Sequence, residues 1–447
     1  MTTFENALNR YCGGLPSAPL ARWAAIFFSL FVLTIQTSIA ASQAFLALAG
    51  ILYIIHLVRA RPAVYFMPVK LPLALFCILS LVSIFWATNP TPGWFALRKL
   101  VLFLIWFLAM NLVVSALHLR RLILGFFLVS FVTSLVGIGQ FIIQYRHVRA
   151  QHPTEVYRYL TTTRIHGFMG HWMHFGGQQM FVLIFLLAYL LLSAKGGSKL
   201  EYQNSASDPQ ASHSDFRTSS FWWILLALVS VSIVLNFTRG VWLGCVLATI
   251  YLVMRWKPRI LLALPLLLVL GYFGAPSLIR ERIHQGMHPT HDPALSIRLE
   301  MWRVAINMIR AHPWAGVGPN NIEEVYGLYL PPGEVPEVGY HNHFHNDFLQ
   351  FGAERGLPCL AAWVWMMAAL GWYTWKLRKR LATQKWIADA SFAVWIAFLA
   401  EGCFEFNFGT SPVLMAFLFV TATPFVAAKL AASGEEALEA KEPSPRL

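Results

Sequence analysis

Three histidines stand two residues apart in YHNHFHNDFLQFGAERGLPCL, at residues 340–360. Histidines so close together could hold a metal or move protons. His341, His343 and His345 would share one face only in an extended segment, whereas tight zinc sites use spacings such as H-E-x-x-H on a helix. No second cluster of metal ligands accompanies them in the sequence. We therefore expect no metal here and favour acid–base chemistry.

His345 stands immediately before a predicted helix. Asp347 followed by Gln350 resembles a capping box, and Gly356 suits the C-terminal turn of a short helix over about 348–354. The positive end of a helix dipole disfavours an imidazolium and attracts anions. A histidine kept uncharged there can accept a proton, so we predict that His345 is a general base. The alternative is a loop histidine whose hydrogen bonds serve only the structure.

Three arginines are candidates for binding an anion. Arg239, in NFTRGVWLG, occupies a very short connection between two apolar runs, where an arginine is costly unless it is paired or functional. The alternative for Arg239 is snorkelling to the lipid head groups. Arg298 lies in the first turn of another predicted helix, and Arg164 lies in RIHGFMGH. Guanidinium groups bind phosphate in a bidentate manner and would stabilise the charge that develops on a pyrophosphate leaving group.

Other polar residues are secondary candidates. Arg98 opens an apolar run and would either snorkel or join the arginine clamp, Arg158 belongs to a basic loop, and Asn346 adjoins the candidate base. We treat these three as further candidates for substrate contacts. Glu401 and Glu405 stand at the end of another apolar run, where carboxylates are candidates for function by default. Pairing with an arginine is the role that we expect for them.

The elements that must position these residues are membrane spans. Apolar residues make up 57% of the 447 residues and charged residues 12%, whereas a soluble domain carries about 25% charged residues. The mean hydropathy is +0.56, and the apolar stretches have roughly the length that a bilayer core requires. We expect an all-α polytopic membrane protein with about twelve transmembrane helices. The predicted spans are about 22–39, 42–58, 71–88, 99–117, 122–144, 174–193, 220–236, 240–254, 259–274, 357–376, 385–403 and 411–430.

Charge sets the expected orientation. The net charge of +13 would suggest nucleic acid in a soluble protein, but here most basic residues flank spans, so we expect no nucleic-acid partner. With both termini in the cytoplasm, the basic connections fall inside, as the positive-inside rule requires. The chain would then form one transmembrane domain, 1–447, with a disordered cytoplasmic loop at 195–219. A helical loop at 275–355 would lie outside, between the ninth and tenth spans.

Two outer connections are longer than the others. Residues 145–171 carry four arginines against Glu155 alone, and such an excess of positive charge suggests an anionic partner outside. The alternative is that long loops cross the membrane regardless of charge. Within 275–355, an amphipathic helix is predicted to begin at Pro293 and to end before Pro313. Its apolar stripe fits a helix that lies along the membrane surface.

Four motifs carry a family resemblance. The stretches RIHGFMGH, FTRGVWLG, SIRLEMWRVAINMIRAHPWAGVGPNN and HNDFLQFGAERGLPCL resemble, in this order, elements of the O-antigen ligase and polymerase superfamily of membrane glycosyltransferases. With the pattern of spans, the resemblance covers most of residues 20–430. One departure is Cys359, which stands where the family has a glycine. It puts a close helix contact in doubt but leaves the histidine assignment intact.

The resemblance implies a fold related to the GT-C glycosyltransferases and a periplasmic active site in a Gram-negative inner membrane. It implies that His345 activates an acceptor hydroxyl, and that Arg239 and Arg298 hold the pyrophosphate with Arg164 as a third arginine. It also implies that no cofactor, nucleotide or metal takes part.

We therefore expect an inverting O-antigen ligase. Its partners would be an O-antigen linked to undecaprenyl pyrophosphate as donor, lipid A–core as acceptor, and membrane lipids. O-antigen polymerases and protein O-oligosaccharyltransferases share this chemistry and remain alternatives. From another class, a transporter or flippase for lipid-linked anions is the alternative. Transporters often show inverted repeats, and we find none in the sequence.

Overall fold

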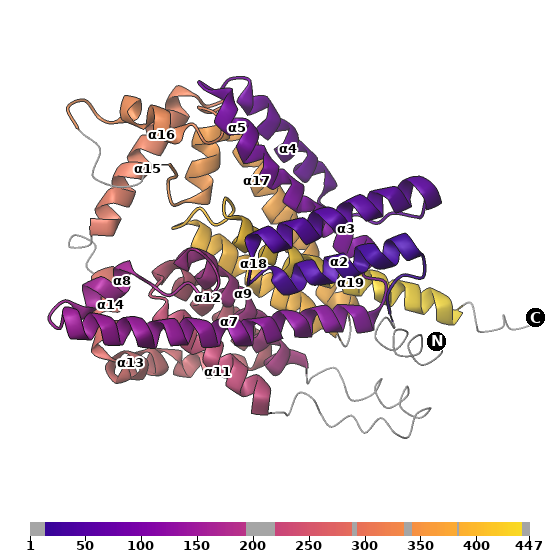
Figure 1. Cartoon of the computed structure of the whole chain (residues 1–447), viewed down its shortest axis with the longest axis horizontal. Coiled ribbons are helices and arrows are strands. Elements are labelled where there is room, and N and C mark those ends of the chain that lie inside the picture. Colours follow the sequence, from indigo (N-terminus) through magenta and orange to yellow (C-terminus); the bar gives the residue numbers. More distant parts are fainter. Residues whose placement is uncertain (1–13, 194–219, 288–292, 335–341, 382–383, 440–447) are drawn as a thin grey trace, which may run out of the picture.

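The structure is a computed structural model that describes residues 14–193, 220–287, 293–334, 342–381 and 384–439 (Figure 1). It is 80% helical, and no strand occurs among these residues. The loop predicted at 195–219 lies outside the described residues, as does His341.

Each of the twelve predicted spans falls on one helix or on a run of consecutive helices. These are α2 (Pro19–Thr34), α3 (Ile39–Ala60), α4 (Lys70–Ile84), α5 (Pro90–Leu97) with η1 (Arg98–Phe103) and α6 (Leu104–Leu112), α7 (Ala116–Gln151), α9 (Trp172–Leu192), α11 (Ser220–Leu235), α12 (Arg239–Trp256), η4 (Pro258–Ala263) with α13 (Leu264–Gly274), α17 (Asp347–Arg380), α18 (Lys385–Gly402) and α19 (Ser411–Glu439). The two longer connections, which are predicted to lie outside, contribute α8 (Val156–Thr162), α14 (Ser277–Met287), α15 (Pro293–Ala311), α16 (Ile322–Val325) and η6 (Tyr326–Tyr329).

The apolar helices make this a multi-pass membrane protein. Among the described residues, six helices are long and apolar enough to cross a membrane, and a seventh crossing results if the η4–α13 segment and α14, which meet at a 120° bend, count as one span. Three further apolar helices, α2, α4 and α11, are shorter. The total of twelve crossings and the relationship to GT-C enzymes therefore stay predictions.

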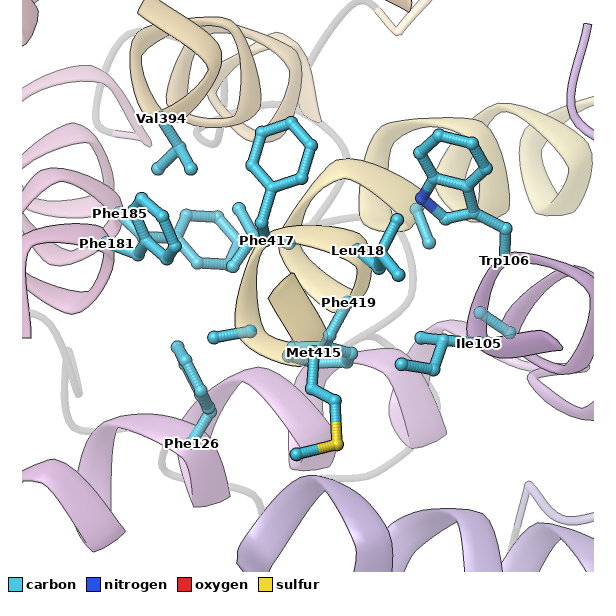
Figure 2. Packing of buried hydrophobic residues seen from close by; sticks show 14 of the residues in the cluster. Ile105, Trp106, Phe126, Phe181, Phe185, Val394, Met415, Phe417, Leu418 and Phe419 are labelled. Carbon is cyan, nitrogen blue, oxygen red and sulfur yellow. The ribbon is translucent and has the colours of Figure 1, made fainter. Parts of the chain in front are cut away.

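The centre of the bundle is α19. The apolar window of this helix is 83% buried, against 28% for α3 at the periphery. Helices α6, α7, α9 and α18 surround it with large side chains (Figure 2). Phe398 of α18 stacks on Phe417 at 4.0 Å between ring centroids, and the Trp106 indole donates to the Thr421 hydroxyl. This close packing fixes the short turn between α18 and α19, which enters the functional site.

Helix α17 is broken at Gly356, as the sequence predicts. Gly356 has φ 80° and ψ 167°, a backbone conformation that other residues rarely adopt. The break receives the 313–318 turn: Leu357 N–H donates to the Pro313 carbonyl at 2.7 Å, and Val317 N–H to the Ala353 carbonyl at 2.9 Å. A Cβ at Gly356 would lie 2.4 Å from the carbonyl of Trp314. The connection that carries α15 and α16 is thereby joined to the start of α17.

The helix cap at the start of α17 differs from the expected one. Asn346, not Asp347, is the N-cap: its side-chain oxygen accepts the Leu349 N–H at 2.9 Å. Asp347 is fully buried and accepts from the Phe408 backbone N–H at 3.2 Å. The reason is that Asp347 is one residue inside the helix, where its side chain reaches the turn before α19 instead of its own backbone.

Helix α15 is present as predicted, but its surroundings differ. Met301, Val304 and Met308 form the expected stripe, and all three are buried in a small separate core together with Val317 and Phe344. The stripe therefore packs on protein and not on the membrane surface. Amphipathicity identifies the buried face of a helix without identifying what covers it.

Candidate functional site

The site is built around Glu405, in the turn between α18 and α19. This buried carboxylate contacts two other segments at once. Its Oε1 accepts a hydrogen bond from the Arg298 guanidinium of α15. Its Oε2 lies 2.7 Å from Nδ1 of His345, just before α17. One carboxylate thus connects the predicted general base to a predicted clamp arginine.

The contact with Glu405 also assigns the roles of the two ring nitrogens in His345. A carboxylate accepts, so Nδ1 carries the proton and Nε2 of a neutral ring is left as an acceptor. His345 has φ 48°, a left-handed conformation that costs about 1–3 kcal/mol outside glycine. Asn346 maintains it: its amide donates to the Cys403 carbonyl while its oxygen caps α17. These hydrogen bonds give Asn346 a structural role, and its substrate contact stays a prediction.

Arg239 is the first residue of α12, whose N-terminus points at the α18–α19 turn. A Cβ on the next residue, Gly240, would lie 3.6 Å from Cγ of Glu401 and 4.0 Å from Cγ of Glu405. The positive end of α12 therefore lies beside the carboxylates, and the charge of Arg239 at this helix start also acts on Arg164. This arrangement attracts anions.

Arg164 belongs to the same group of cations. Burial and the charges of Arg282, Arg298 and Arg239 lower its pKa to about 10, although Glu405 opposes the shift. The guanidinium lies over the Trp172 ring at 5.2 Å, and its Nε donates to the Thr161 carbonyl. Three other guanidiniums are thus close enough to act on the charge of Arg164. The positive charge of this group exceeds what one buried glutamate can balance, which favours the binding of an anion.

Arg282, on α14, was not identified from the sequence. It is buried, and its Nε donates to the Phe237 carbonyl at 3.0 Å. Arg282 also acts on Tyr157 of α8: burial raises the pKa of Tyr157, and Arg282 lowers it in part. The segment RERIHQG contains no motif that distinguishes this arginine from its neighbours. In Figure 1, α8 and α14 lie together at the C-terminal end of α7.

Asn236 holds the arginine segments in place. It is fully buried in the turn between α11 and α12. Its amide donates to the carbonyls of Ile165 and Trp172 at 3.0 and 3.1 Å, and its oxygen accepts from Thr238 Oγ1 at 2.5 Å. The loop that carries Arg164 is thereby tied to the turn that carries Arg239.

Comparison with protein families gives this geometry a context. Residues 224–364 match the family model described as O-Antigen ligase. The chain carries a domain of the O-antigen ligase family. The match supports a membrane glycosyltransferase activity of the O-antigen ligase or polymerase type for this chain. A comparison with curated proteins found no match.

The ligase-family domain contains most of the site but not all of it. Arg239, Arg298 and His345 lie within the matched residues, and so does the unexpected Arg282. Glu405 and Arg164 lie outside them. The site is therefore completed by the turn before α19 and by the segment that carries Arg164.

Two further histidines lie beside His345 in the ligase-family site. The ring centroids of His343 and His345 are 4.2 Å apart, and burial together with His345 lowers the pKa of His343 to about 4. Burial also lowers the pKa of His171, the N-cap of α9. Both are therefore uncharged near neutral pH. Within the described parts of the chain, no group of three or more His, Cys, Asp or Glu residues could hold a metal ion.

Two candidates lie away from Glu405. Arg98 donates to the Phe95 carbonyl at 3.0 Å, and its guanidinium lies over the Phe95 ring. The Arg158 side chain is 78% exposed and pairs with Glu155 at 3.5 Å. Substrate contacts by Arg98 and Arg158 stay predictions.

Proposed function

We propose that this protein is an O-antigen ligase, which transfers O-antigen from undecaprenyl pyrophosphate to lipid A–core at the periplasmic face of the inner membrane. The observation that carries the proposal is the position of Glu405 between His345 and Arg298. It couples a proton acceptor to a phosphate-binding group, which are the two functions that glycosyl transfer from a pyrophosphate requires.

In the proposed reaction, an acceptor hydroxyl gives its proton to Nε2 of His345. Its oxygen attacks the anomeric carbon of the donor from the face opposite the pyrophosphate, and the configuration inverts. The bond between that carbon and the pyrophosphate oxygen breaks, and its electron pair leaves with undecaprenyl pyrophosphate. The Glu405 carboxylate, 2.7 Å from Nδ1, stabilises the imidazolium that forms.

The arginines bind the pyrophosphate in this mechanism. Arg298 directs a nitrogen to Glu405, but a guanidinium has five N–H donors, so others are left for phosphate oxygens. Arg239 and Arg164 supply further charge, and we add Arg282 to this group. The loss of one such donor typically costs about 3–4 kcal/mol of transition-state stabilisation.

We also propose the cellular arrangement that follows. The chain would form a single unit in a Gram-negative inner membrane, with both termini in the cytoplasm and residues 275–355 in the periplasm. The arginines of residues 145–171 would favour a phosphorylated acceptor. The reaction would need neither nucleotide nor metal.

Reconstitution tests the function directly. Purified protein in liposomes, supplied with lipid-linked O-antigen and lipid A–core but no nucleotide, should form the joined product, and a chelator should not reduce the yield. His345→Ala should bind the donor but transfer no glycan. Full transfer by this variant would remove the general-base role.

The same assay separates the alternatives. A polymerase would lengthen the glycan on undecaprenyl pyrophosphate without lipid A–core, and a protein oligosaccharyltransferase would need a protein acceptor. A flippase would move the lipid between leaflets without forming a covalent product. Each of these outcomes contradicts the ligase assignment.

A further inference from the structure

A long apolar groove of about 540 Å³ lies between α17 and α18. Aromatic rings form its walls, with Trp363, Trp372 and Trp375 on α17 and Phe392 and Trp395 on α18. Every side chain that lines the groove is apolar. It therefore suits a hydrocarbon chain and offers nothing to a polar head group.

Specific side-chain contacts hold one wall of the groove in place. At Gly371, a Cβ would lie 2.8 Å from the Trp395 ring, so glycine allows this ring to lie directly against α17. The Trp395 indole donates to the Met367 carbonyl at 2.9 Å, and the ring stacks on Phe392. One wall is therefore fixed by hydrogen bonding and stacking. Gly371 and Ala368 also line the groove and add no bulky side chain to it.

The lining of the groove includes residues close in sequence to the functional site. Phe348 and Leu399 both line the groove. Phe348 follows His345 by three residues, and Leu399 precedes Glu405 by six. Each of these groove residues is therefore within six positions of one member of the His345–Glu405 pair along the chain.

Hydrophobicity alone cannot select the occupant, because lipid tails are as apolar as the groove itself. A chain attached to a head group bound at the site has an advantage over free lipids, because its binding becomes intramolecular. The groove thus favours the chain whose phosphate head sits among the arginines.

We propose that the groove between α17 and α18 holds the polyprenyl chain of the donor, with its head at His345 and the arginines. This inference rests on the proposed function. It extends the site from the pyrophosphate into the membrane and makes the length of the chain a determinant of affinity.

Binding measurements test the groove without requiring catalysis. Undecaprenyl pyrophosphate and the short-chain geranyl pyrophosphate are titrated against purified protein in detergent. Ala368→Trp should fill the groove, whereas Ala47→Trp, at an exposed position of α3, is the matched control. We expect Ala368→Trp to weaken undecaprenyl pyrophosphate about tenfold, or about 1.4 kcal/mol, and to leave geranyl pyrophosphate unchanged.

Other results overturn the proposal. Equal affinity of both variants for undecaprenyl pyrophosphate would exclude the groove, and an equal loss for both ligands would locate the effect at the head. A photoreactive undecaprenyl chain should label residues 363–375 or 392–399. Labelling elsewhere, or stronger labelling there by a photoreactive lipid A, would contradict the assignment.

The two hypotheses fail in different ways. If the chain occupies the groove but no glycan is transferred to lipid A–core, the ligase function is wrong and the groove stands. If transfer proceeds and Ala368→Trp has no effect on the long-chain donor, the groove is wrong and the function stands.

Discussion

At the scale of single residues, the chemistry depends on Glu405 because it serves two partners. Its carboxylate orients His345 and holds Arg298 in the same place. Replacement by glutamine keeps the shape and removes the charge. We expect Glu405→Gln to lower the glycan transfer rate about 10²-fold, measured with purified enzyme and saturating donor.

The matched control is Glu401→Gln. Glu401 is also buried at the end of α18, but its recorded hydrogen bond is with Asn407. It should lose much less activity. Equal losses in both variants would mean that burial of a carboxylate, and not its contact with the base, matters.

Acid should weaken the contacts of Glu405 with Arg298 and His345. Burial alone would raise the pKa of Glu405, but Arg298 and the hydrogen bond with His345 outweigh it and hold the pKa below the ordinary 4.5. A carboxyl group of this kind adds stability that is complete above its unfolded pKa and is lost as the pH falls through the lower folded value.

Thermal unfolding of wild type and Glu405→Gln over a range of pH tests this expectation. Wild type should be the more stable protein at about pH 7. The difference should persist down to the ordinary carboxyl pKa of 4.5 and shrink below it. A difference that is independent of pH would contradict the ionic role of Glu405.

Local sequence explains which site residues could be predicted. Arg239 stands out because an arginine in a short connection between apolar runs needs a partner, and His345 because it precedes a helix. The expected pairing of Glu405 with an arginine is confirmed by Arg298. Its contact with His345 joins residues 60 positions apart, and Arg282 owes its place to the carbonyl of Phe237. Neither long-range contact leaves a local signal.

At the scale of elements, the break in α17 joins the segment with α15 and α16 to the site. We expect Gly356→Ala to destabilise the protein by more than about 1 kcal/mol, because the added methyl group would meet the Trp314 carbonyl and φ is positive. Thermal unfolding in detergent measures the loss.

Gly139→Ala in α7 is the control for this substitution. No atom lies within 4 Å of a Cβ at this position, and alanine favours a helix more than glycine does. It should be neutral or slightly stabilising. If Gly356→Ala were as stable as this control, the break would not need glycine.

A substitution in the turn between α11 and α12 should impair activity. Asn236→Leu removes the hydrogen bonds that tie Arg164 and Arg239 to one frame. We expect the KM for donor to rise about tenfold or more, because misplaced clamp groups lose binding. A normal KM in a folded variant would contradict this role, and folding is checked by size-exclusion chromatography.

Helix positions followed from the sequence more readily than helix surroundings. Apolar runs bounded by glycine, proline and charge located the helices, and Gly356 with Pro358 located the break. The partner of the α15 stripe and the switch of the cap from Asp347 to Asn346 depend on the packing of other segments. No pattern within either segment reports this packing.

At the scale of the whole molecule, the orientation in the membrane is the main prediction left to test. In a variant without native cysteines, Arg158→Cys should react with an impermeant maleimide in intact spheroplasts, because its side chain is exposed on the expected outer side. Lys257→Cys, exposed between α12 and η4, should react only after permeabilisation. The reverse pattern would place the site in the cytoplasm.

The sharing of Glu405 has a consequence for protein engineering. Arg298 belongs to α15, His345 to the start of α17 and Glu405 to the turn before α19. In chimeras between relatives, residues 293–334 would not transplant as an independent cassette. A graft that changes the donor sugar would need to bring its own version of residues 401–409, so that the two grafted pieces match.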